Sequence, residues 1–311
     1  MDYQRVLFAF VISLFMGFGC SQSGPETVPD ESVVETASGA EAVEEVVEPA
    51  GDIKRSLLWR AEGTGGPVWL FGTIHGSVDA STFEDLPGEL QEAIESSELV
   101  VLEIDFTDLE MGNIASRTVL PQDQPLDAQL GEERWEKLGE LLPIPGEQLR
   151  FLQPWLVYTV LLQTMLGEEE PVDYAIVAHA TARNKEFAYL ETAEEQIDII
   201  ARSITVELLG ELIDDPQAVR EGLDSLVTAY KAGDAETLEA LVFDEEEMKK
   251  HPQMIEELII KRNHSWMSHV EQYLERGHVF VAVGAGHLLG DEGLVQLLRA
   301  QGVEVTRVDP R

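Results

Sequence analysis

Two short apolar segments with one helical segment between them constrain the fold of this chain more than any other feature. Residues 68–74 are rich in strand-forming side chains, and residues 99–104 form a second, almost wholly apolar run. Between the two, residues 84–97 carry apolar side chains at helical spacing and an acidic outer face. A strand that is apolar throughout is normally covered on both sides of its sheet. Strand, helix and strand in this order predict a parallel pair of strands with a right-handed crossover.

Helical periodicity dominates the rest of the chain. Helices are expected at residues 131–141, 148–166, 172–184, 193–212, 216–232, 235–248, 252–274 and 288–301. Short strands are expected at residues 187–190, 278–283 and 303–308. The fold class is therefore α/β, with a mixed, largely parallel sheet flanked by helices. A helical insertion separates the N-terminal and C-terminal segments of that sheet.

The length and charge of the chain limit its organisation and its partners. A chain of 311 residues, 44% of them hydrophobic, is long enough for one large domain or two small ones, and we expect one. Lys and Arg together number 21, against 59 Asp and Glu. A surface this negative repels phosphate backbones, so we expect no nucleic-acid partner.

A single cysteine, Cys20, lies close to the N-terminus. Because the chain has no second cysteine, the folded part can contain no disulfide, no cysteine-based zinc ribbon and no thiol nucleophile. Arg5 precedes an apolar run at residues 6–18 that is short for a membrane span, and a small residue, Gly19, comes directly before the cysteine. Residues 1–20 resemble a bacterial lipoprotein signal, with Cys20 as the lipidated residue. An ordinary signal peptide or an uncleaved anchor is the alternative.

An acidic segment follows the expected signal. Residues 21–53 contain nine acidic and no basic residues, together with three prolines. We expect residues 21–56 to be a disordered, solvated tether and residues 57–311 to be the folded domain. Ser21 stands where an aspartate would favour inner-membrane retention. The expected location is the cell envelope, lipid-anchored, at the outer membrane or periplasmic face if the source has two membranes.

Two segments have the same form, an apolar strand followed by Gly-x-x-His. The first ends at His75 and the second at His287. Glycines at the end of a strand let the backbone turn sharply or approach a ligand closely, so each imidazole is expected at the rim of the sheet. Two such histidines after two parallel strands predict that they converge.

Two carboxylates follow other predicted strands. Glu103 ends the second apolar run, and Glu191 follows the strand at residues 187–190. If all four strands are parallel, His75, Glu103, Glu191 and His287 share the sheet edge at which ligands bind in open α/β folds. A carboxylate in such apolar surroundings needs a cation, a metal or hydrogen-bond donors.

A buried guanidinium is the expected partner. Arg262 and Asn263 fall within an apolar stripe on the predicted helix at residues 252–274. A guanidinium that faces the core needs an acidic partner, and Glu103 or Glu191 is suitable. A structural ion pair that ties the helix to the sheet is the alternative to a catalytic role.

Taken together, these motifs resemble the TraB/GumN family, which includes bacterial proteins linked to pheromone shutdown and the animal Tiki proteases. The resemblance spans about residues 57–311. It is carried by the first Gly-x-x-His motif, Glu103, Leu190-Glu191-Thr192 with Glu195-Gln196, Arg262-Asn263 with Trp266, and Val283-Gly284-Ala285-Gly286-His287-Leu288.

The resemblance implies a site and a cofactor. In Tiki relatives the two histidines and the strand glutamate are implicated in metal-dependent peptide cleavage, which gives His75, Glu103 and His287 here as metal ligands. Such a set suits a divalent ion, zinc, manganese or cobalt. Glu191 would be a base or orient another ligand, and Arg262 would stabilise an oxyanion. With Glu103 and Asn263 these residues form the expected catalytic group.

Two functions remain open from the sequence. The first is a metal-dependent hydrolase of the cell envelope that acts on peptides, with hydrolysis of a non-peptide ester as a variant. The second is a non-catalytic protein that sequesters a peptide or small-molecule ligand in the same cleft. The sequence contains no Gly-x-Ser-x-Gly elbow, no His-Glu-x-x-His zinc helix and no P-loop, so other catalytic classes have little support.

Overall fold

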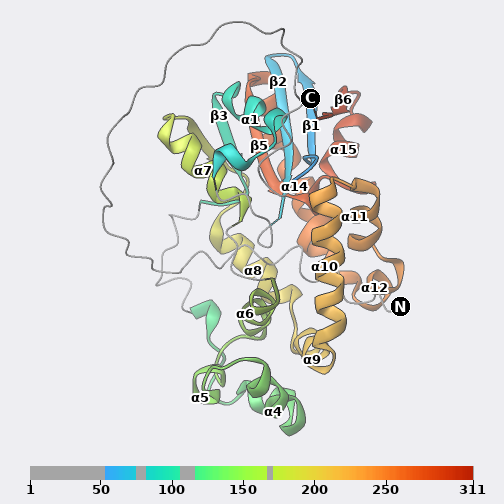
Figure 1. Cartoon of the computed structure of the whole chain (residues 1–311). Helices are drawn as coiled ribbons and strands as arrows, with labels where there is room; N and C mark the ends of the chain where they lie inside the picture. Colours follow the sequence, from blue (N-terminus) through green and yellow to red (C-terminus); the bar gives the residue numbers. More distant parts are fainter. Residues whose placement is uncertain (1–52, 75–81, 106–115, 167–170, 311) are drawn as a thin grey trace, which may run out of the picture.

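The computed structural model describes residues 53–74, 82–105, 116–166 and 171–310 (Figure 1). A six-stranded sheet with the order β4-β3-β5-β2-β1-β6 forms its centre. The strands are β1 (Leu58–Gly63), β2 (Gly66–Thr73), β3 (Leu99–Leu102), β4 (Glu186–Tyr189), β5 (Val279–Gly284) and β6 (Val305–Arg307).

The sheet is mixed and mostly parallel, as predicted. Strands β2, β5, β3 and β4 run parallel to one another, whereas β1 is antiparallel to both β2 and β6. The predicted pair β2 and β3 is parallel, but β5 lies between the two strands. Strand β1 is not among the predicted strands, because polar Arg60 and Glu62 interrupt its apolar pattern. It forms a hairpin with β2.

Helices make up most of the chain between β3 and β5, which confirms a helical insertion that β4 interrupts. They are α3 (Leu126–Leu130), α4 (Glu132–Leu141), α5 (Gly146–Leu149), α6 (Pro154–Leu166), α7 (Val172–Ala182), α8 (Ala193–Ser203), α9 (Val206–Asp214), α10 (Pro216–Ala232), α11 (Ala235–Val242), α12 (Glu245–Lys250), α13 (Pro252–Ile255) and α14 (Lys261–Arg276). Helix α1 (Gly88–Glu95) precedes β3, and α15 (Leu294–Ala300) follows β5. In Figure 1 the sheet lies in the upper part of the molecule, with α4, α5, α6 and α9 below it.

Several predicted helices are shorter or divided. The helix expected at residues 235–248 ends before Asp244, whose side chain accepts hydrogen bonds from two backbone amides and so begins α12. The helix expected at residues 288–301 begins only at Leu294. Gly290 has a φ of 76°, which a right-handed helix does not accept, and α15 starts after that turn.

The long helix expected at residues 252–274 contains an irregular turn. A π-helical segment, Glu256–Ile260, lies between α13 and α14. A π turn shifts the side chains that follow it around the helix axis, and such turns are frequent at functional sites. Arg262 and Asn263, which come directly after it, are both buried. The irregular turn thus helps to direct two polar side chains toward the sheet.

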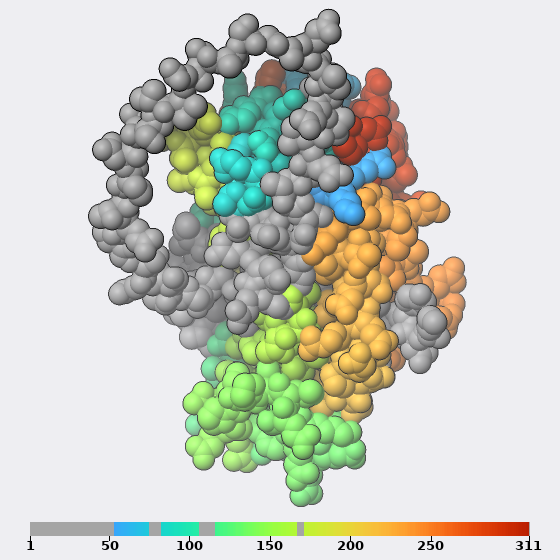
Figure 2. All heavy atoms as spheres, in the orientation of Figure 1, coloured from blue at the N-terminus to red at the C-terminus, as the bar shows by residue number. Residues whose placement is uncertain are grey.

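One continuous core joins the sheet to the helices. Helix α14 packs against β1, β2 and β5. The space-filling view in Figure 2 shows the N-terminal strand and helix segments together with the C-terminal residues at one end, and residues of α4 and α5 at the other. Ile53 and Ser56, at the end of the expected tether, are already buried in the core, so packing begins before residue 57.

The expected signal, with Cys20, and the expected tether up to residue 52 lie outside the described residues. Among the helices that the structure describes, none has the length and apolar character needed to span a membrane.

Candidate functional site

Three polar residues meet beyond the carboxyl ends of three parallel strands. Glu103 directly follows β3, Glu191 comes two residues after β4, and His287 ends a short 3-10 helix, η5 (Ala285–His287), that follows β5. The backbone amide of Glu191 donates to the carbonyl oxygen of Glu103 at 3.0 Å. The structure therefore brings three of the four residues expected at this sheet edge together. His75 lies outside the described residues.

Glycines allow the close packing that forms this edge. Strands β2 and β5 are neighbours, with Thr73 opposite Gly284. A Cβ atom added to Gly72 would lie 2.9 Å from Cα of Ala285, so the first motif needs a glycine to let the second approach. The backbone amide of Gly284 donates to Oε1 of Glu103 at 2.8 Å. Both motif glycines thus contribute to the site through backbone proximity.

The guanidinium of Arg262 is the centre of the site. Its Nη2 atom donates to Oε1 of Glu191 at 2.6 Å and also to Oε2 of Glu103. Its Nε atom donates to Glu191 at 3.0 Å, and its Nη1 atom donates to the carbonyl oxygen of Leu258 at 2.9 Å. The three charged side chains are 3 to 7% exposed. One buried cation therefore joins two buried carboxylates to the long helix.

Gln196 on α8 connects the same two carboxylates. Its Nε2 atom donates to Glu103 and to Glu191, each at 3.0 Å. Its Oε1 atom is buried and has no hydrogen-bond partner among the described residues. Because the amide nitrogen is held by two acceptors, the amide oxygen remains an available acceptor inside the site.

Asn263 fixes the tautomer of His287. The amide nitrogen of Asn263 donates to the carbonyl oxygens of His287 at 3.2 Å and of Glu292 at 2.8 Å, so its Oδ1 atom must face the imidazole. Oδ1 lies 2.7 Å from Nδ1 of His287, which places the proton on Nδ1. Nε2 is left with a lone pair, and it accepts from Nη1 of Arg262 at 3.0 Å.

Trp266 covers the base of the site. Its ring centroid is 4.5 Å from that of His287, and the Arg262 guanidinium carbon lies 4.6 Å from it. An aromatic face beside a buried guanidinium is a favourable cation–π contact. The indole therefore holds both functional groups from one side.

Burial and charge pairing shift the pKa values of Glu191 and Arg262. Burial raises the pKa of Glu191 above its ordinary value, although Arg262 and Gln196 act in the opposite direction. Burial acts to lower the pKa of Arg262, but Glu103 and Glu191 outweigh it and raise that pKa overall. The two carboxylates share one guanidinium, that of Arg262. A further cation or a proton would complete the balance.

A divalent cation fits the chemistry of these donors. Glu103 offers an anionic oxygen and His287 offers the Nε2 lone pair, with 3.8 Å between Oε1 and Nε2. Over the described ranges, which omit His75, no group of three or more His, Cys, Asp or Glu side chains is arranged to hold a metal ion. A bound ion would share Glu103 with Arg262 but would take the place of Nη1 at His287, because Nε2 has only one lone pair.

Sequence reasoning found most of these residues but not their full connections. It proposed either Glu103 or Glu191 as the partner of Arg262, whereas the structure pairs Arg262 with both. It did not assign Gln196 a role, although its position five residues after Glu191 on a capped helix was a usable signal. It also missed Tyr230, whose hydroxyl donates to the carbonyl oxygen of Gly72 at 2.9 Å and holds the end of β2.

Comparisons with known proteins find distant relatives over most of the chain. It is 23% identical to the metalloprotease TIKI2 of Danio rerio over 79% of this chain and 59% of that protein. It is 25% identical to the metalloprotease TIKI1 of Danio rerio, over 83% of this chain and 64% of that protein. An uncharacterized protein of Treponema pallidum is 23% identical, over 79% of this chain and 81% of that protein.

The chain thus spans about three fifths of the length of the two zebrafish relatives. No solved structure matches it. A model of the TraB/PrgY/gumN family matches residues 57–307, a range that begins at β1 and ends with β6 and contains every residue of the buried network. The chain belongs to the TraB/PrgY/gumN family.

Proposed function

We propose that this protein is a metal-dependent peptidase. The observation that carries the proposal is the buried arrangement in which Glu103 and Glu191 share one guanidinium beside the Nε2 lone pair of His287. Perturbed, buried charged groups at the carboxyl edge of a parallel sheet are typical of catalytic sites. The names of the TIKI relatives, all metalloproteases, support the choice of reaction.

The residues expected to hold the ion are His75, Glu103 and His287. Asn263 keeps Nδ1 of His287 protonated and so directs the Nε2 lone pair into the site, as the outer partners of metal-bound histidines do. A divalent ion there would act as a Lewis acid on the scissile carbonyl and on water. Its identity, zinc, manganese or cobalt, is left to experiment.

The remaining residues have proposed roles of their own. Glu191 accepts a proton from the attacking water and passes it to the leaving amine, because its carboxylate borders both the buried network and the outer cavities. Arg262 donates to both Glu103 and Glu191 and so holds the two carboxylates side by side. Its proposed role toward a developing oxyanion falls to the Nη1 hydrogen that faces His287, which would turn from the imidazole to the oxyanion. Gln196 keeps the two carboxylates at a fixed separation.

The proposed location is the cell envelope. Cys20 follows a short apolar segment that resembles a lipoprotein signal, and the acidic residues after it would hold the domain away from the membrane surface. A peptidase at this location would act on peptides outside the cytoplasm.

A peptide-cleavage assay tests the proposed function. The full chain, purified in detergent without chelator, is incubated with a decapeptide library and Zn²⁺, Mn²⁺ or Co²⁺, and the products are identified by mass spectrometry. We expect cleavage that a chelator abolishes and that Glu191→Gln lowers at least a hundredfold. Glu239→Gln, which alters an exposed carboxylate on α11, is the matched control and should leave cleavage unchanged.

Absence of cleavage with all three metals would overturn the peptidase proposal. If the same peptides nevertheless bind, the protein is better described as one that sequesters peptides in this cleft.

A further inference from the structure

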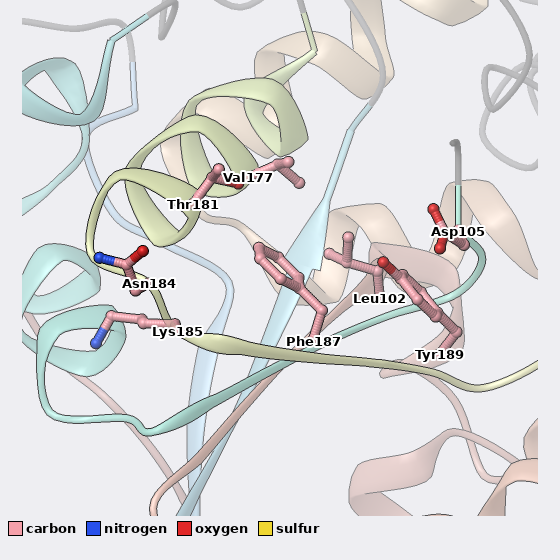
Figure 3. Close-up of a pocket in the computed structure, with 8 residues that line it drawn as sticks. All are labelled: Leu102, Asp105, Val177, Thr181, Asn184, Lys185, Phe187 and Tyr189. Carbon is pink, nitrogen blue, oxygen red and sulfur yellow. The ribbon is translucent and has the colours of Figure 1, made fainter. Parts of the chain in front are cut away.

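Three adjoining cavities form a groove that leads from strand β4 to Glu191. The first, of about 500 Å³, lies between α7 and the ends of β3 and β4 (Figure 3). The second, of about 380 Å³, shares Asp105 and Tyr189 with the first. The third, of about 480 Å³, shares Leu190, Glu191, Glu195 and His269 with the second. We call these three cavities together the β4 groove.

Strand β4 has backbone groups beside this groove that pair with no other strand among the described residues. It is the outermost strand of the sheet formed by the described residues. The amides of Glu186 and Leu190 donate to Glu98 and Leu102, so alternate residues of β4 bond toward β3. The backbone groups of Phe187 and Tyr189, at the intervening positions, face away from β3. An extended segment can add to such an edge as a further strand.

The first cavity suits a large apolar side chain. Figure 3 shows Phe187 and Leu102 on neighbouring strands, both on the side that faces Val177 of α7. Apolar atoms contribute most of the surface of this cavity. Its volume is ample for a leucine or an aromatic ring, because pockets for whole small ligands begin at about 300 Å³.

The second cavity suits a basic side chain. Asp105, Glu191 and Glu195 all line it, and its lining contains neither lysine nor arginine. Arg262 already pairs with Glu191, whereas Glu195 bonds to the neutral side chain of Thr192. The formal net charge of the chain, −38, would attract a cationic peptide over a longer range.

We infer that the β4 groove binds an extended, cationic peptide segment that adds to β4 as an extra strand. One large apolar side chain of the peptide occupies the first cavity, and a Lys or Arg side chain lies over Asp105 and Glu195. The peptide backbone then passes Glu191 and the buried network beyond it. The inference rests on the proposed peptidase function only in regarding this peptide as the substrate; the binding itself does not depend on turnover.

Equilibrium binding of a positional-scanning library of fluorescein-labelled decapeptides tests the inference. Anisotropy is recorded with the full chain in detergent and excess chelator, so that no cleavage occurs. We expect the selected peptides to contain a large apolar residue and, within a few positions, Lys or Arg. Replacing either residue with Ala or Glu should weaken binding at least tenfold. No preference for these residues, or no binding with a dissociation constant below 1 mM (a binding free energy of about −4 kcal/mol), would overturn the inference.

A cavity-filling variant locates the bound peptide. Val177→Trp places an indole in the first cavity and should weaken binding of the best decapeptide at least tenfold. Val227→Trp, at a similarly half-buried valine on α10, is the matched control and should leave binding unchanged. Unchanged binding in a folded Val177→Trp protein would contradict the proposed position.

Backbone methylation of the best decapeptide tests strand addition itself. Phe187 and Tyr189 are the residues of β4 that face outward, so N-methylation should weaken binding at least tenfold at two peptide residues that lie two positions apart, and little at the residue between them. An effect without this period of two would refute an added strand.

The two proposals fail separately. Peptide binding with the expected residue and methylation pattern, but without cleavage in the presence of metal, would refute the peptidase proposal and support peptide binding in the β4 groove. Cleavage of peptides that is unaffected by Val177→Trp would support the peptidase proposal and refute peptide binding in the β4 groove.

Discussion

The Nδ1 atom of His287 lies 2.7 Å from Oδ1 of Asn263, and this contact determines which imidazole nitrogen carries the proton. Asn263 cannot turn its amide around, because its nitrogen already donates to two backbone carbonyl oxygens. Nε2 of His287 is therefore the nitrogen with the lone pair, and it is the one that faces Arg262. Asn263 on α14 thus determines which imidazole nitrogen of His287, beyond β5, carries the proton.

The first prediction concerns this tautomer. In ¹⁵N NMR spectra of the wild-type protein without added metal, we expect His287 to carry its proton on Nδ1. Asn263→Leu removes the acceptor of that proton and leaves buried carbonyl oxygens without a donor, so it should lower stability by about 3 kcal/mol. A proton found on Nε2 in the wild type would contradict the hydrogen-bond assignment.

The second prediction concerns Gln196. Its amide donates to both carboxylates of the network, and Gln196→Glu would replace that donor with a third buried anion. We expect a loss of about 3 kcal/mol or more in chemical denaturation. Gln301 also donates to a carboxylate, that of Glu271, but at the surface. Gln301→Glu is therefore the control and should cost less than about 0.5 kcal/mol. Equal losses in the two variants would show that the bridge at Gln196 has no special importance.

The third prediction concerns the contact between the two glycine motifs. Gly72→Ala would place a Cβ atom 2.9 Å from backbone and side-chain atoms of Ala285, so we expect a loss of about 1 to 3 kcal/mol. Gly139 lies inside α4 with open space around the position of a Cβ atom, and Gly139→Ala should raise stability by up to about 1 kcal/mol. Thermal melting of both variants checks the opposite signs. An unchanged melting temperature in Gly72→Ala would show that the two strand ends are not closely packed.

The fourth prediction concerns the expected lipid anchor. Cys20 is the only cysteine of the chain, so Cys20→Ser should abolish labelling with a radioactive fatty acid and release the protein from the membrane fraction. Ser21→Ala is a neighbouring control that should keep both properties. Unchanged labelling and fractionation of Cys20→Ser would refute the lipoprotein interpretation.

Three strands of the parallel part of the sheet, β2, β3 and β5, could be predicted from the sequence because they are largely buried. Strands β2, β3 and β5 consist of nearly uninterrupted apolar residues, and such runs give a clear signal. Their order in the sheet gave no such signal. Strand β5 pairs with both β2 and β3 through contacts between residues about 200 positions apart, and local patterns carry no information about such contacts.

The candidate site could likewise be predicted in part, because its residues gave a signal in the sequence and their connections did not. Arg262 stands out in the sequence because a guanidinium within an apolar stripe must find an anion. The sharing of Arg262 between Glu103 and Glu191 depends on the pairing of β3 with β4, which brings both strand ends together. The bridging amide of Gln196 depends in addition on how α8 packs. Connections of this kind are three-dimensional and have no fixed spacing along the chain.

The most direct test of the central claim is the metal content of the purified protein and of its single-site variants. Wild-type protein and the variants His75→Ala, Glu103→Gln and His287→Ala are dialysed against Zn²⁺, Mn²⁺ or Co²⁺, and bound metal is measured by mass spectrometry beside the melting temperature. We expect about one ion per wild-type chain, and at least a tenfold weaker affinity in each variant, because two remaining ligands hold a metal poorly. Wild-type protein that binds none of the three metals, or folded variants that bind them as tightly as wild type, would contradict the account.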